Sequence, residues 1–152
     1  MKNNLEANFK VDWVLNKELA VGRAPTNQSH IEILKSENIV AILSLCSEEE
    51  VSPPHNIESY FTCKRLILPD HKSNELLSLE QINYAIKILT EIKLLGPVFV
   101  HCVASVERSP LICMAWLIKM HNLNPKQALD YLMEIHKGTN PLASQYKILL
   151  SL

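Results

Sequence analysis

The sequence predicts an α/β fold in which a central mixed sheet of about four or five strands is flanked by helices. Three observations support this class: short β-branched apolar runs typical of buried strands, amphipathic stretches with helix caps, and strands and helices that alternate before three helices end the chain. The 152 residues, of which 47% are hydrophobic, suit one domain with its own core. We expect residues 1–152 to form that domain, with 1–10 as a loosely ordered N-terminal segment.

The first half of the chain contains the apolar runs from which we predict most of the strands. Four segments are strand candidates: residues 11–19, 20–23, 39–45 and 60–68. Pro25 ends the second of them, and Asn27 or Ser29 is expected to cap a helix that runs to about Glu37. The acidic stretch 47–58 contains two adjacent prolines, so we expect it to form an exposed loop.

The second half is predicted to be mainly helical. Ser78 and Gln81 form a capping box before a stretch with one apolar face, and Gly96 ends that helix. Residues 98–101 are typical of a short buried strand. Three helices are then expected, each opened by a capping side chain and a proline: Ser109-Pro110, Asn124-Pro125 and Asn140-Pro141. The first is apolar almost all round and should be central, and the second should close at Gly138.

The charges of the chain nearly cancel, with 15 Lys and Arg against 16 Asp and Glu. This balance argues against bulk attraction to nucleic acid or to an anionic membrane surface, so affinity for any anion must come from a local site. No apolar run resembles a signal peptide or approaches the roughly 18 residues that span a bilayer. We therefore expect a cytoplasmic protein without nucleic-acid or membrane partners, and a monomer by default.

The cysteines match neither a zinc site nor a CxxC redox pair in their spacing. They are Cys46, Cys63, Cys102 and Cys113. The histidines also lack metal-ligand spacing, so we expect no metal, and catalysis by a cysteine nucleophile needs no organic cofactor. Three of the thiols lie in apolar stretches and are interpreted as core residues. Cys102 differs because it stands between a predicted strand and a loop, and it is the candidate nucleophile.

The segment 101–109, HCVASVERS, links a predicted strand to the start of a predicted helix. The backbone N–H groups of such a loop and the helix dipole together favour a bound anion. A thiol at a helix N-terminus or beside a cation ionises readily. Arg108 can bind two phosphate oxygens at once, and Ser109 can donate a hydrogen bond to the Cys102 thiolate. The segment therefore predicts a phosphate site with a cysteine nucleophile.

This segment resembles the HCxxGxxR[S/T] signature of protein tyrosine and dual-specificity phosphatases, and the short chain is similar to the small atypical dual-specificity type. The likeness extends beyond the loop. Residues 22–25 (GRAP) and the run 39–45 (IVAILSL) resemble the N-terminal half of these enzymes. The segment LILPD, which ends at Asp70, resembles the loop that carries their general acid, at close to the usual distance before Cys102. The resemblance covers about residues 11–150.

The resemblance implies a dual-specificity phosphatase-like fold and a role for each motif residue. Cys102 is expected to attack phosphorus and Asp70 to protonate the leaving oxygen. Ser109 is expected to assist the departing thiolate, and His101 to orient the loop by hydrogen bonds. The phosphate-binding loop is expected to comprise Val103, Ala104, Ser105, Val106, Glu107 and Arg108. The implied substrate is a phosphorylated protein or small phosphoester, hydrolysed through a cysteinyl-phosphate intermediate.

Two residues depart from what the family signature leads us to expect. Ser105 stands where the signature has glycine. If the loop needs φ > 0 there, serine costs on the order of 1 kcal/mol, so Ser105→Gly is predicted to raise activity several-fold. Glu107 places a carboxylate beside Arg108, where it either weakens phosphate binding or points outward. Its charge argues against a highly anionic inositol-phosphate substrate.

Three other functions are compatible with these residues. A phosphate-binding pseudophosphatase with little turnover is suggested by Ser105 and Glu107. An RNA 5′-phosphatase of the same fold is expected to carry a basic surface, which the composition does not indicate. Sulfur transfer through a persulfide on Cys102 leaves Asp70 without a role. An assay with a small aryl phosphate separates the enzymes from the binding module.

Overall fold

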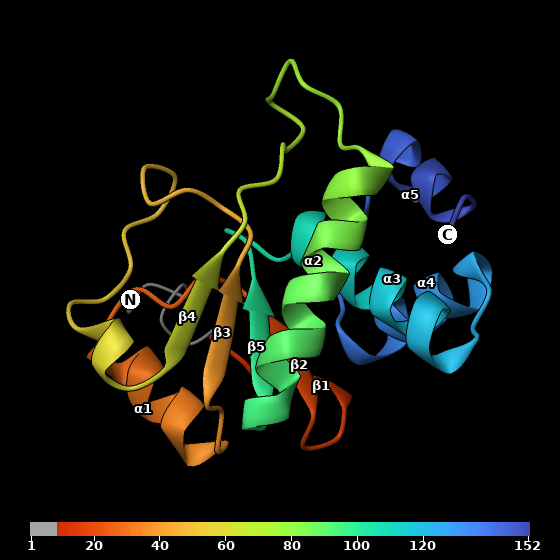
Figure 1. Ribbon diagram of the computed structural model, residues 1–152. Helices are drawn as coiled ribbons and strands as arrows, with labels where there is room; N and C mark the ends of the chain where they lie inside the picture. The colour runs from red at the N-terminus through yellow and green to blue at the C-terminus, as the bar shows by residue number, and fades with distance from the viewer. Residues whose placement is uncertain (1–8) are drawn as a thin grey trace.

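The computed structural model describes residues 9–152. Residues 1–8 of the segment 1–10, which was predicted to be loosely ordered, lie outside the described residues. A mixed five-stranded sheet stands between helices on its two faces (Figure 1). The strand order is β1-β2-β5-β3-β4, in which β1 is antiparallel to β2 and the other neighbours are parallel. The α/β class predicted from the sequence is thereby confirmed.

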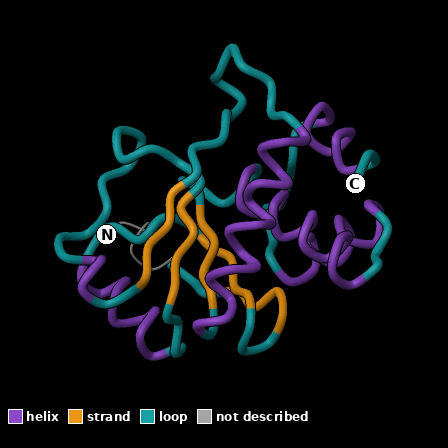
Figure 2. Tube along the Cα trace, viewed as in Figure 1, coloured by secondary structure: helices purple, strands orange, loops and turns teal. Residues whose placement is uncertain are grey.

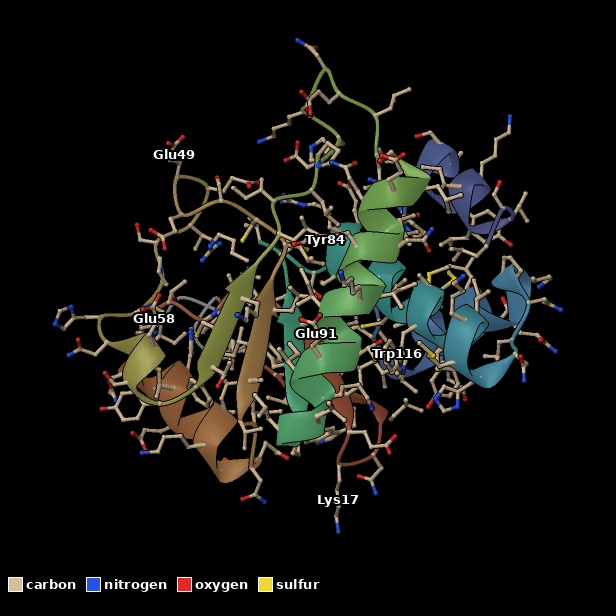
Figure 3. The ribbon with its side chains drawn as sticks, viewed as in Figure 1. Lys17, Glu49, Glu58, Tyr84, Glu91 and Trp116 are labelled. Atoms are coloured by element: carbon tan, nitrogen blue, oxygen red, sulfur yellow. The ribbon has the colours of Figure 1, made fainter. Side chains whose placement is uncertain are left out.

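The strands are β1 (Asp12–Leu15), β2 (Leu19–Gly22), β3 (Ala41–Ser44), β4 (Thr62–Arg65) and β5 (Val98–His101). β5 has its predicted bounds, β2 is shifted by one residue, and the other three strands are shorter than predicted. The run 11–19 is interrupted because the chain reverses after β1, where Lys17 has a left-handed φ of 60°. Figure 3 shows Lys17 at the tip of that turn. The apolar runs thus indicated the strands without locating the turn between the first two.

The helices mostly begin at the predicted caps. They are α1 (Gln28–Ser36), α2 (Leu79–Ile92), α3 (Arg108–His121), α4 (Pro125–Ile135) and α5 (Ala143–Leu149), with short 3₁₀ turns η1 (Ile57–Ser59) and η2 (Lys93–Leu95). Asn27 caps α1, and capping boxes open α2 at Ser78 and α4 at Asn124. α4 ends before Gly138, because His136 leaves the helical conformation with φ −133° and ψ 86°.

Two predicted helix starts are wrong. α3 begins at Arg108 and not after a Ser109 cap, because the N–H of Leu111 already bonds the carbonyl of Glu107 at 3.0 Å. The Ser109 hydroxyl instead contacts side chains of the preceding loop. α5 begins at Ala143, since the N–H of Asn140 is used in a hydrogen bond to Val106 O and its segment stays extended. In both places contacts from outside the helix override the local capping signal.

The strands alternate their side chains between two cores, as their period of two requires. One face packs under α2, α3, α4 and α5, and contributes Leu19, Val21, Ala41, Leu43, Val98 and Val100. The other face packs against α1 and contributes Ala20, Ile42 and Phe99. α3 is buried along residues 108–117, as its apolar sequence predicts, and lies at the centre of the larger core. Figure 3 shows Tyr84 and Glu91 on α2.

The carboxyl ends of four strands meet at one edge of the sheet. Gly22 and Ser44 are each in register with His101, and Arg65 is in register with Ser44. The segments that follow β2, β3, β4 and β5 therefore lie together, along the upper edge of the sheet in Figure 2. Gly22 permits close packing here, since a Cβ on it would lie 2.5 Å from Lys10 O. No helix in residues 9–152 has the length and apolar character needed to cross a membrane.

Candidate active site

The segment 102–108 forms a loop between the central strand β5 and the N-terminus of α3. Cys102 directly follows β5, and Arg108 is the first residue of α3. Both side chains are buried, with 3% and 4% of their surface exposed. This is the strand-loop-helix arrangement predicted from the sequence, and it directs the positive end of the α3 dipole toward the loop.

The carbonyl groups of the loop are held outward by neighbouring segments. Cys102 O accepts from His101 Nδ1 (2.8 Å), Val103 O from Ala24 N (3.1 Å), Ser105 O from His136 Nε2 (2.8 Å) and Val106 O from Asn140 N (2.9 Å). In a trans peptide the C=O and the next N–H point in opposite directions, and the described residues contain no cis bond. The N–H groups of Val103, Ala104, Val106 and Glu107 therefore turn toward the inner side of the loop, where they can donate hydrogen bonds to an anion. We call these four N–H groups the cradle.

His101 is neutral and fixes the start of this loop. A carbonyl only accepts, so Nδ1 of His101 must carry the hydrogen that bonds Cys102 O. Nε2 then accepts from the Ser44 hydroxyl, 2.7 Å away at the end of β3. Burial lowers the pKa of His101 to about 4, which keeps the ring neutral near pH 7. His101 thus ties two strand ends together, in keeping with the orienting role predicted for it.

Arg108 is held by Glu50, a residue that the sequence analysis placed in an exposed loop. The Nη2 and Nη1 atoms of Arg108 lie 2.8 Å and 3.2 Å from the two Glu50 carboxylate oxygens. Nη1 also donates to Leu45 O and Leu68 O. Within residues 9–152 these bonds use the Nη1 hydrogens and one Nη2 hydrogen of Arg108. The Nε hydrogen and the second Nη2 hydrogen, which lie along the other edge of the guanidinium, remain available to a ligand. That free edge has the geometry to bind two phosphate oxygens.

Glu50 is the main functional residue that sequence reasoning missed. The hydrogen bond from Arg108 is the largest influence on Glu50 and lowers the pKa of its carboxyl group. Its neighbour Glu49 points outward at the tip of the same segment (Figure 3). The available signal was topological: residues that follow β3 lie beside those that follow the adjacent parallel strand β5. An acidic run at that place therefore includes a candidate partner for Arg108.

Asp70 lies in the segment after β4 and lines, together with the loop, a cavity of about 390 Å³. The cavity is lined by Glu50, Asp70, His71, Lys72, Cys102, Val103, Ala104, Val106, Glu107 and Arg108. Oδ2 of Asp70 lies 4.0 Å from Arg108 Nη2, and Oδ1 accepts from the N–H of Lys72 at 2.9 Å. The structure therefore brings the predicted acid, the predicted nucleophile and the predicted phosphate ligand to one cavity.

Glu107 points away from the phosphate cradle and contacts the acid-bearing segment. Its Oε2 lies 2.6 Å from His71 Nδ1, one residue after Asp70, and its Oε1 accepts from Gln145 Nε2 at 3.3 Å. Of the two alternatives raised by the sequence, the outward orientation is the one observed. The carboxylate links the Asp70 segment and α5 to the loop.

Ser105 has the left-handed backbone conformation that its family glycine would favour, with φ of 59°. Its side chain is buried and bonds Ser109 Oγ at 2.8 Å and His136 Nε2 at 2.9 Å. Ser109 Oγ in turn lies 3.3 Å from Cys102 Sγ, the contact predicted for it. The loop is thus closed despite the serine.

The other thiols are poor nucleophiles. Burial raises the pKa of Cys46 and of Cys113, and raises that of Cys63 to about 11. Cys46 and Cys113 are buried, as predicted, and Cys63 is partly buried. No cluster of three or more metal-ligating side chains occurs in residues 9–152.

The chain is similar in sequence to known proteins. The model of the dual-specificity phosphatase catalytic domain matches residues 19–152. Dual specificity protein phosphatase 2 of Mus musculus is 29% identical over 109 residues, 71% of this chain and 32% of that protein. The phosphatidylglycerophosphate phosphatase PTPMT1 of Arabidopsis thaliana is 24% identical over 148 residues, 97% of this chain and 44% of that protein. The chain thus spans less than half the length of these relatives.

Solved structures share the fold. A crystal structure of PTPMT1 has a TM-score of 0.79 at 19% identity, with 93% of this chain and 92% of that one covered. The structure of Tk-PTP in its active form has a TM-score of 0.79 at 20% identity, with 93% and 95% covered. The family model spans most of the chain and includes both the HCVASVERS loop and Asp70. On this match, the chain belongs to the dual-specificity phosphatase family.

Proposed function

We propose that the protein hydrolyses phosphomonoesters through a phosphocysteine formed on Cys102. The observation that carries this proposal is the single cavity onto which Cys102, Arg108 and Asp70 all open. The free edge of Arg108 and four inward N–H groups offer donors to a phosphoryl group above the Cys102 sulfur. A pseudophosphatase needs the N–H groups and Arg108 but has no use for Asp70, whose carboxylate lies 4.0 Å from Arg108 in the same cavity.

The reaction has two steps. The Cys102 thiolate attacks phosphorus and forms an S–P bond while the ester P–O bond breaks, and the Asp70 carboxyl gives its proton to the leaving oxygen. Water then attacks phosphorus and gives a proton to the Asp70 carboxylate, and the S–P bond breaks to restore the thiolate. Arg108 and the N–H groups of the loop stabilise the charge on the phosphoryl oxygens throughout.

The test is hydrolysis of 4-nitrophenyl phosphate by wild type, Cys102→Ser and Cys63→Ser. Wild type and Cys63→Ser are expected to turn over at similar rates, since Cys63 lies on β4 outside the cavity. Cys102→Ser is expected to lose turnover and to retain orthovanadate or phosphate binding, because the cradle and Arg108 remain. Wild type that binds oxyanion but shows no turnover on any ester would favour the pseudophosphatase. Turnover by Cys102→Ser close to wild type would remove Cys102 from the mechanism.

The substrate we favour is a phosphorylated protein, with a lipid-headgroup monoester as the second candidate. The cavity is lined by three carboxylates, Glu50, Asp70 and Glu107, against two cations, Arg108 and Lys72, and this lining disfavours a substrate with several further phosphates. The lipid candidate is supported by the Arabidopsis relative named as a phosphatidylglycerophosphate phosphatase, and by a PTPMT1 structure in complex with PI(5)P. The values of kcat/KM for phosphotyrosine peptides and for a phospholipid monoester in mixed micelles distinguish the two classes.

A further inference from the structure

A buried chain of hydrogen-bonding side chains runs from β1 to the Cys102 sulfur. Asp12 Oδ2 lies 2.6 Å from His136 Nδ1, and His136 Nε2 lies 2.9 Å from Ser105 Oγ. Ser105 Oγ lies 2.8 Å from Ser109 Oγ, which lies 3.3 Å from Cys102 Sγ. His136, Ser105 and Ser109 expose 8%, 2% and 0% of their surface. The position where the family signature has glycine is thus the centre of this chain.

The chemistry of the partners sets the direction of donation. Ser105 O only accepts, so His136 Nε2, 2.8 Å away, carries a hydrogen and points it at Ser105. That hydrogen also faces Ser105 Oγ, so the hydroxyl hydrogen of Ser105 turns the other way, to Ser109 Oγ. Ser109 has one hydrogen, and because Ser105 already donates to it, that hydrogen is free for the Cys102 sulfur. Asp12 accepts from Nδ1 and fixes the plane of the His136 ring, which with a hydrogen on each nitrogen is a cation paired with Asp12.

We propose that Ser105, His136 and Asp12 are positioning residues that aim the Ser109 hydroxyl at the Cys102 thiolate. The inference rests on the proposed function, in which that thiolate attacks in the first step and leaves in the second. A hydrogen bond from a neutral hydroxyl stabilises an ionised acceptor more than its protonated form. The serine of this loop therefore supplies a hydroxyl that glycine cannot supply.

This proposal reverses the effect predicted for Ser105→Gly. Backbone strain alone predicts a gain, because glycine reaches φ of 59° without steric cost. The chain of hydroxyls predicts a loss, because glycine leaves Ser109 without its donor and His136 without one of its contacts. The two effects have opposite signs, so the variant discriminates between them, and it folds readily because glycine suits the conformation.

The experiment measures the rate at which iodoacetamide alkylates Cys102 as a function of pH, which requires no turnover. Ser105→Gly, Ser105→Ala and His136→Leu are each expected to move the midpoint of the profile to higher pH. At pH 6 these variants should alkylate about five- to tenfold more slowly than wild type, the scale of one buried hydrogen bond. His136→Gln, whose amide can donate to Ser105, should restore most of the wild-type rate. The other charged or titratable groups around Cys102 are unchanged in all variants: Arg108, His101, Glu50, Asp70, His71, Lys72, Glu107, Cys46 and Cys113. His136→Leu and His136→Gln both replace the ring by a neutral side chain, so the difference between these two variants reports the hydrogen bond to Ser105.

The control is Thr139→Val, which removes a buried hydroxyl that bonds His136 O at 2.7 Å but lies outside the chain. It is expected to lower the melting temperature and leave the alkylation profile in place. In a Ser109→Ala background, Ser105→Ala should cause no further shift, because the chain acts through Ser109. The proposal would be overturned if Ser105→Ala shifted the pH midpoint of alkylation equally with and without the Ser109 hydroxyl. It would also be overturned if the Ser105 and His136 variants lowered the melting temperature but left the alkylation profile unshifted. Failure of the proposed function would show instead as absent turnover with the wild-type profile intact.

Discussion

At the scale of single residues, Arg108 divides its donors between two tasks. Its end is bound by Glu50 and by two main-chain carbonyls, which hold the guanidinium in one orientation inside the protein. Its side remains available to a ligand. The Glu50 pair also supplies the negative charge that a buried guanidinium needs when the site holds no anion. Preorganisation of this kind lowers the cost of ordering Arg108 when phosphate arrives.

Asp70→Asn tests the role of the second carboxyl group. The amide retains the acceptor for the N–H of Lys72, so the segment should keep its conformation. It cannot give up a proton, so we expect esters with poor leaving groups to slow by roughly 10²–10⁴-fold and 4-nitrophenyl phosphate by much less. Steady-state kinetics on a series of aryl and alkyl phosphates measures this dependence. Equal losses along the whole series would mean that Asp70 is structural.

At the scale of elements, the loop between β5 and α3 is shaped by contacts from four other segments. The β2–α1 connection, His101 of β5, the end of α4 and the segment before α5 each bind one loop carbonyl. The segment after β4 adds the contact of His71 with Glu107. The conformation of seven residues therefore depends on the packing of most of the molecule.

The contact between His71 and Glu107 should hold the Asp70 segment near the loop. His71 is about half exposed, with 52% of its side-chain surface accessible, so the effect is expected to be small. We predict that His71→Ala and Glu107→Gln each slow hydrolysis of alkyl phosphates by about two- to fivefold, and that the double variant is no slower than either. A double-mutant cycle in kcat/KM measures the coupling. Multiplicative losses would show that the two side chains act independently.

The burial of His101 predicts how stability depends on pH. The folded pKa of His101 is depressed to about 4 from an ordinary value of 6.5, so the unfolded chain binds a proton first as the pH falls. The contribution of His101 is therefore complete above pH 6.5 and is lost progressively between 6.5 and about 4, by on the order of 3 kcal/mol. Urea unfolding of wild type and His101→Asn across this range measures it. The two curves should converge toward acid, and parallel curves would contradict the assignment.

At the scale of the whole molecule, the parallel strands bring together residues that lie far apart in the chain. The sequence predicted the sheet, the caps of α1, α2 and α4, and the position of the loop, because these depend on local periodicity and capping. It did not predict Glu50 or His136 as partners of the loop, because each comes from another element and belongs to no local motif. The wrong start of α3 has the same cause, since the Ser109 hydroxyl bonds Cys102 and Ser105 instead of capping.

The measurement that tests the account most directly is detection of the phosphocysteine. Wild type and Asp70→Asn are mixed with 4-nitrophenyl phosphate, quenched rapidly and digested for mass spectrometry. We predict one added phosphoryl group on the peptide that contains Cys102, at higher occupancy in Asp70→Asn because the second step lacks its base. The same peptide from Cys102→Ser should remain unmodified. Turnover without a phosphorylated Cys102 peptide, or a phosphoryl group on another residue, would contradict the central claim.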